Sequence, residues 1–161
     1  MAAGNTYVPI ATNTVTGSAV ANYTFSSIPG TYTDLVLVVD GTTSSLEDIT
    51  VQYNGDTGSN YSITYLSGSG TAAASGRQSN ANQITLGYLG TVQGGTIFQF
   101  MNYSNTTTYK TALARANVSN WSVAAKVGLW RSTAAINSIK LAHPNTFLVG
   151  TTFSLYGIAA A

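Results

Sequence analysis

The chain has 161 residues, enough for one domain with a sizeable core. Only 7% of its residues are charged, and the formal net charge is +1. An ordinary soluble domain carries about 25% charged residues, so this chain has few groups for acid–base catalysis or metal capture. It also lacks the concentrated basic patch that nucleic acid or an anionic membrane surface requires. The composition therefore predicts a non-catalytic protein that assembles with other chains.

Three further observations narrow the range of protein classes that fit the sequence. The sequence contains no cysteine, which excludes disulfides, thiolate metal sites and cysteine nucleophiles. The first ten residues lack the basic and apolar regions of a secretory signal. No apolar run approaches the ~18–20 residues of a membrane-spanning helix. We therefore expect no secretory leader and no membrane partner.

Apolar residues recur mainly with a period of two, or in short β-branched runs, and turn residues separate these segments. This pattern predicts an all-β fold, a single antiparallel β-sandwich of about eight to ten strands. In chain order, the expected strands are residues 21–25, 32–40, 49–53, 61–66, 84–89, 96–103, 109–117, 121–130, 136–142 and 151–158.

Four segments carry more specific expectations. Residues 1–19 are apolar and uncharged, and we expect an extended arm or first strand that reaches a neighbouring subunit. Residues 20–161 form the sandwich domain. Residues 32–40 contain a continuous apolar run, which is typical of a strand covered on both faces. Residues 67–83 are small and polar, and they are expected to form a long surface loop.

The connector between residues 53 and 61 offers oxygen ligands from Asn54, Asp56 and Asn60. Calcium binds such oxygens, but a tight site normally needs more than the one carboxylate present here. The alternative is a hydrogen-bonded turn, in which Asp and Asn side chains cap backbone amides. We favour the turn, and we assign no metal and no cofactor.

The sequence offers little material for catalysis. His143 is the one histidine, and its position before Pro144 predicts an extended loop. The sequence has no G-x-S-x-G nucleophile elbow to accompany His143, and no evident acid lies near this histidine in the sequence. The acidic pair Glu47-Asp48 is expected at a solvated strand entrance, where it can also serve a ligand or a subunit contact. No spacing selects the carboxylate pair of a glycosidase. We expect no catalytic residue and no enzyme.

Ten tyrosines and two tryptophans are the stronger argument for binding, because their large rigid rings suit subunit interfaces and stacking on sugars. Tyr61, with other tyrosines near the same loops, can line a carbohydrate-binding face. The alternative is that most of them are core or interface residues. Trp121 and Trp130 lie an odd number of residues apart on one strand and should face opposite sides. One is expected in the core, and the other at a contact with another protein subunit.

Five segments, in this order, together resemble a small β-sandwich module of tailed-bacteriophage virion proteins. They span roughly residues 20–158, nearly the whole chain. The segments are Tyr32-Thr-Asp-Leu-Val-Leu, Val51-Gln-Tyr-Asn-Gly-Asp-Thr-Gly-Ser-Asn-Tyr61, Met101-Asn-Tyr-Ser-Asn-Thr-Thr-Thr-Tyr-Lys110, Gly128-Leu-Trp-Arg-Ser-Thr-Ala-Ala-Ile136 and Phe153-Ser-Leu-Tyr-Gly-Ile158.

The resemblance implies a jelly-roll-like sandwich, a homotrimer and a place on the virion. Such modules decorate capsids as cement proteins, or they lie at the ends of tail fibres. This module stands almost alone, without a fibre shaft, which favours a decoration protein on the capsid exterior. Its partners would be its own copies and the major capsid protein. The alternative is a tail-fibre or tail-tip module that binds a host surface glycan.

Overall fold

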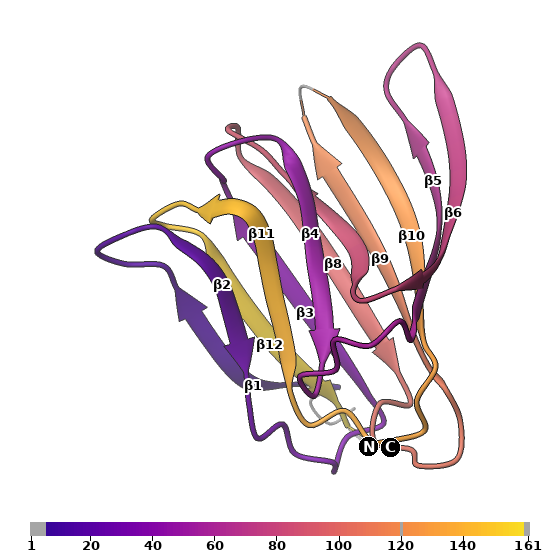
Figure 1. Cartoon of the computed structure of the whole chain (residues 1–161). Coiled ribbons are helices and arrows are strands. Elements are labelled where there is room, and N and C mark those ends of the chain that lie inside the picture. The colour runs from indigo at the N-terminus through magenta and orange to yellow at the C-terminus, as the bar shows by residue number, and fades with distance from the viewer. Residues whose placement is uncertain (1–5, 120, 160–161) are drawn as a thin grey trace.

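The computed structural model describes residues 6–119 and 121–159. Within this part of the chain, all twelve regular elements are β-strands (Figure 1). Their bounds are β1 (Tyr7–Thr14), β2 (Val20–Phe25), β3 (Asp34–Gly41), β4 (Glu47–Tyr53), β5 (Tyr61–Gly68), β6 (Ala73–Ala81), β7 (Ile84–Leu89), β8 (Gly94–Met101), β9 (Lys110–Val118), β10 (Ser122–Trp130), β11 (Ile139–Phe147) and β12 (Thr152–Ile158). The described residues include no helix with the length and apolar character needed to cross a membrane.

The strands form two antiparallel sheets that pack as a sandwich. The large sheet has eight strands in the order β1-β12-β3-β8-β9-β10-β5-β6, and the small sheet has four in the order β2-β11-β4-β7. Without the hairpins β5–β6 and β9–β10, two four-stranded sheets remain, β1-β12-β3-β8 and β2-β11-β4-β7. This is the strand order of a jelly roll. The all-β sandwich predicted from the sequence is confirmed.

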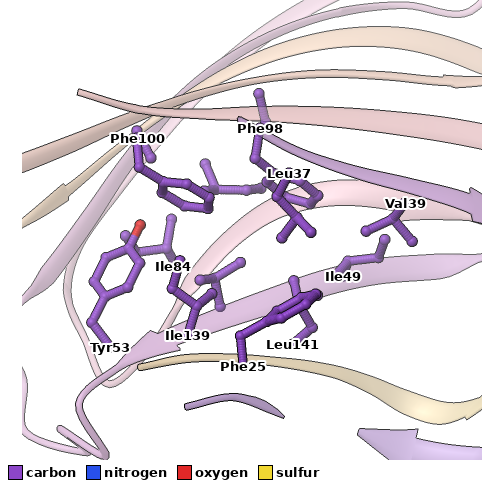
Figure 2. Close-up of a cluster of buried hydrophobic side chains, with 14 of the residues drawn as sticks. Phe25, Leu37, Val39, Ile49, Tyr53, Ile84, Phe98, Phe100, Ile139 and Leu141 are labelled. Atoms are coloured by element: carbon purple, nitrogen blue, oxygen red, sulfur yellow. The ribbon is translucent and has the colours of Figure 1, made fainter. Parts of the chain in front are cut away.

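The core lies between the two sheets. Figure 2 shows Leu37 and Phe98 of the large sheet facing Phe25 and Leu141 of the small sheet. All four side chains are buried, with at most 3% of their surface exposed. Alternate residues of each strand point into this layer, as the period of two requires. Packing between the sheets therefore supplies the stability that disulfides cannot supply here.

The structure corrects the sequence prediction in the segment 67–83. The expected surface loop contains β6, which pairs with β5 and forms an edge of the large sheet. Both faces of β6 are exposed along most of its length, so its residues are small and polar and show no apolar alternation. Together with β1, this strand raises the count to twelve, above the expected eight to ten.

The N-terminal segment also has a defined place. Residues 7–14 form β1, which pairs with β12 of the same chain. Pro9 lies on this edge strand beside an irregularity in the pairing, which protects the edge from further strand addition. Residues 1–5, the remaining part through which we expected contact with a neighbour, lie outside the described residues.

The continuous apolar run of β3 is covered on one face only, which is the second correction. Leu35, Leu37 and Val39 point into the core and are fully buried. Val36 and Val38 point to the other side of the large sheet, where the described chain provides no second layer, although neighbouring side chains of the same face leave Val36 only 7% exposed. A strand with both faces apolar normally lies between two layers, so this outer side lacks a cover.

Candidate functional site: the outer face of the large sheet

The loop after β4 is a closed hydrogen-bond network. The Asp56 carboxylate accepts hydrogen bonds from the Gly58 backbone N–H at 2.8 Å, from Asn60 Nδ2 at 3.0 Å and from Trp130 Nε1 at 2.7 Å. Although burial acts to raise the pKa of Asp56, these hydrogen bonds hold it below its usual value. The carboxylate is therefore already occupied by donors from the protein.

Asn54 joins the same loop to the segment before β11. It has a left-handed backbone (φ 53°), which asparagine tolerates better than most residues. Its Nδ2 donates to the Ala135 carbonyl, and its Oδ1 accepts from the backbone N–H groups of Asn137 and Ser138. These hydrogen bonds use both polar atoms of the Asn54 side chain and hold the loop against the segment before β11. In the described residues, no group of three or more histidines and carboxylates is placed to hold a metal.

Tyr61 and Trp130 are core residues. Tyr61 is fully buried, donates its hydroxyl to the Asp56 carbonyl and accepts from the Tyr53 backbone N–H. Its ring stacks on Trp130 at a centroid distance of 6.3 Å, and Trp130 is 2% exposed. An external sugar cannot reach the Tyr61 ring, which corrects the carbohydrate-face interpretation for this residue. The other tryptophan, Trp121, is 45% exposed.

His143 lies within β11, not in the loop expected from the sequence. Its side chain is buried, it packs against Phe147, and Nδ1 accepts from the Asn145 backbone N–H. Burial lowers the pKa of His143, so the ring is held neutral. None of the side-chain hydrogen bonds among the described residues joins it to a serine hydroxyl or a carboxylate.

The sequence analysis missed the outer face of the large sheet, the side turned away from the core. The strand register aligns Leu66, Ala125, Arg115, Ile97 and Val38 across five neighbouring strands. Next to this row lies a second row of Val127, Leu113, Gln99 and Val36, in which only Gln99 is polar. With the adjoining positions, the apolar residues of the outer face include Val36, Val38, Leu66, Ile97, Met101, Leu113, Val123, Ala125, Val127 and Leu129.

Several of these side chains are widely exposed. Leu66 is 63% exposed, Val123 62% and Val127 47%. An open trough of about 710 Å³ crosses this face between β3 and β5, and Gly68 and Gly95 leave room within it. Two charged residues, Asp40 and Arg115, also line the trough. Neither forms an ion pair with another described residue.

A contiguous apolar face of this kind marks an interaction surface in a soluble protein. The sequence does contain a signal for it, because 32–40 and 121–130 carry apolar residues at both sets of alternating positions. Fold and surface together define an all-β sandwich, with jelly-roll strand order, that presents one apolar sheet face to its surroundings. Comparison of the chain with known protein families, curated proteins and solved structures finds no match.

Proposed function

We propose that this chain is a virion structural protein of a tailed bacteriophage. It forms a homotrimer and decorates the exterior of the major capsid shell as a cement protein. Its role is mechanical, and it performs no catalysis. The single observation that carries the proposal is the uncovered apolar outer face of the large sheet, and the five sequence segments that resemble phage virion modules direct it to the virion.

The favourable free energy of association would come from burying the apolar side chains of the outer face against another chain. Full burial of a leucine or valine side chain contributes roughly 1.5–3 kcal/mol relative to leaving it exposed. Leu66, Val123 and Val127 each leave about half or more of the side chain uncovered in the single chain. Removing several such side chains from water can offset the loss of rotational and translational freedom on association.

The occupant of the trough that we propose is a second copy of this chain. The net charge of +1 means that two copies repel each other very little. Asp40 and Arg115 have opposite charges and lie on the same trough, so Arg115 of one copy can pair with Asp40 of the next. Such a charge pair would set the register of an interface that is otherwise apolar.

On the shell, the trimer would stabilise the assembled capsid by binding preferentially to it. A protein that binds the assembled capsid but not its separated subunits shifts the equilibrium toward the assembled state. A low-charge surface rich in hydroxyl and amide groups has few ions to desolvate on docking. The expected result is a capsid that resists heat and low salt better with the protein than without it.

The first experiment tests the interface. Light scattering coupled to size exclusion should give a trimer for the wild-type chain. Val123→Lys on the outer face should weaken association at least about 30-fold, because a charge replaces a buried apolar group. Val149→Lys is the matched control, since Val149 is equally open (56% exposed) but lies outside the outer face. A monomeric wild type, or equal effects of the two variants, would contradict the proposed interface.

The second experiment tests the location on the virion. Immunogold electron microscopy of intact virions with an antibody to this chain should place gold over the head. Gold at the tail end would replace the decoration role with the alternative tail-tip role. Particles without gold would refute a place on the virion altogether.

A further inference from the structure

A polar pocket opens on the inner side of the large sheet, at the flank where the small sheet ends. The edge strand of the small sheet is β7, and the large sheet continues past it through β10, β5 and β6. Figure 1 shows the β5–β6 hairpin standing apart at this end of the molecule. The pocket encloses about 210 Å³, and its chemically active lining consists of Asp48, Tyr65, Gln78, Thr85, Tyr88 and Lys126.

The floor of the pocket is an ion pair. Lys126 is 3% exposed, and its Nζ donates to Asp48 Oδ1 at 2.5 Å. The same ammonium lies 3.8 Å from the ring centroid of Tyr88. The positive charge is therefore neutralised within the protein. The Asp48 side chain remains 35% exposed, and its Oδ2 accepts no hydrogen bond from the described residues.

Two tyrosine rings form the walls, and other residues hold both rings in place. Tyr65 lies against the backbone of Gly76, where an added Cβ would come within 2.6 Å of Tyr65 Cζ. Trp121 meets Tyr88 edge-on at 4.9 Å. Burial, with Asp48 nearby, raises the pKa of Tyr88 to about 12, so its hydroxyl stays neutral and can donate.

We propose that this pocket binds one neutral hexopyranose ring. The C–H groups of a sugar ring pack against aromatic faces, and its hydroxyls need several donors and acceptors at once. Tyr65 offers a ring face, whereas the Lys126 ammonium already lies over the Tyr88 ring and Tyr88 therefore contributes its hydroxyl. Asp48 Oδ2, the Thr85 hydroxyl and the Gln78 amide offer polar groups that no side-chain hydrogen bond within the described chain engages.

Size and charge define the ligand further. Drug-sized ligands occupy pockets of roughly 300–1,000 Å³, so a space of about 210 Å³ suits one ring. A uronic acid would bring its carboxylate toward the free oxygen of Asp48, and the Lys126 charge is already paired. A neutral sugar is therefore favoured over an acidic one.

The pocket does not depend on the assembly interface proposed above. Tyr65 and Lys126 alternate along their strands with Leu66 and Val127, which belong to the outer face. Because neighbouring residues of a strand point to opposite sides, the pocket and the outer face open in opposite directions. A docked chain would thus leave the pocket free, and either proposal can fail while the other holds.

Saturation-transfer difference NMR on the full chain tests the inference. The probes are the methyl pyranosides of glucose, galactose, mannose and N-acetylglucosamine, each titrated to about 100 mM because single sugars bind in the millimolar range. At least one of them should bind saturably. Methyl glucuronide should bind at least about 5-fold more weakly than the corresponding glucoside, because Asp48 repels it.

A pair of matched double variants places the binding in the pocket. Thr85→Val with Gln78→Ala should weaken the sugar at least about 10-fold, since two hydrogen bonds are lost while both tyrosine rings remain. Thr91→Val with Gln93→Ala makes the same chemical changes at exposed positions outside the pocket and should stay within about 2-fold of wild type. If none of the four sugars binds, or if both double variants bind like wild type, the inference is overturned.

Discussion

Trp130 of β10 donates its indole N–H to Oδ2 of Asp56 over 2.7 Å, which joins the large sheet to the loop that leaves the small sheet. The two residues lie 74 positions apart in the chain. The indole ring is 2% exposed, so water cannot replace the carboxylate as its acceptor. In the sequence, the oxygen atoms of this loop suggested an ion site. In the structure, the loop instead links the two sheets through the Trp130–Asp56 hydrogen bond, which we call the clamp.

Removing this clamp should destabilise the fold. Asp56→Ala leaves the buried indole N–H without an acceptor and removes the cap on Gly58, so the free energy of unfolding should fall by about 1.5–3 kcal/mol. Urea denaturation followed by tryptophan fluorescence measures the change. Thr57→Ala, at an exposed position of the same loop, serves as the control and should stay within about 0.5 kcal/mol of wild type. Equal effects of the two variants would show that the clamp adds nothing.

The Lys126–Asp48 pair should behave as a coupled unit. Lys126→Ala leaves Asp48 without its cation at a partly buried position, and burial already raises the pKa of this carboxyl. We expect a loss of about 1–3 kcal/mol, moderated by the solvent that reaches Asp48. In the double variant Lys126→Met with Asp48→Asn the loss should be smaller, because no unpaired charge remains. Chemical denaturation of the variants gives the coupling energy, and strictly additive losses would contradict the coupling.

Gly157 should tolerate no side chain while Tyr32 is present. A Cβ at this position would lie 2.2 Å from Tyr32 Cγ, far inside contact distance. We expect Gly157→Ala to lower the melting temperature, with a cost of about 1–3 kcal/mol from overpacking. Adding Tyr32→Ala to Gly157→Ala should recover part of this loss. Gly30→Ala is the control, because its added Cβ would meet its nearest neighbour at an ordinary 3.7 Å.

Acid should weaken the fold through His143 before it affects Asp56. The folded-state pKa of His143 lies below the ordinary 6.5 because the ring is buried, so protonation favours the unfolded chain. Stability should be fully present above about pH 6.5 and fall as the pH drops, by at most about 1.4 kcal/mol per pH unit for one proton. Unfolding curves at pH 7.5 and 5.5 measure this loss.

His143→Gln isolates the contribution, since it removes the imidazole and leaves the neighbouring carboxylates of Glu47 and Asp48 in place. The variant should show a smaller difference between the two pH values than wild type, whatever its absolute stability. A difference as large as in wild type would assign the acid sensitivity to other groups. The contribution of Asp56 is lost only when the pH falls through its own lowered pKa, outside this range.

The sequence predicted the strands that carry an alternating or continuous apolar pattern. The segment 84–89 has the same bounds as β7, and 61–66 falls within β5. It did not predict β6, because a strand exposed on both faces has no apolar alternation to detect. The turn interpretation of the loop at Asp56 needed only local chemistry, since Asp and Asn side chains bond to nearby backbone amides.

Other features depended on residues far apart in the chain. Whether another layer covers one face of β3 or both depends on how many layers the fold contains. The apolar pattern within a single strand does not give the number of layers. Likewise, Tyr61 and Tyr65 are both strand tyrosines in the sequence, yet one is core and the other lines a pocket. Their difference arises because β7 is the last strand of the small sheet.

By itself, then, the sequence determined a sparsely charged, cysteine-free, all-β chain, because composition and a period of two express backbone geometry and solvent exposure residue by residue. The tertiary structure alone decided which apolar face stays open and which polar residues meet at the flank. Both depend on strand order and on the unequal width of the two sheets, which arise from pairings across more than a hundred residues such as β1 with β12.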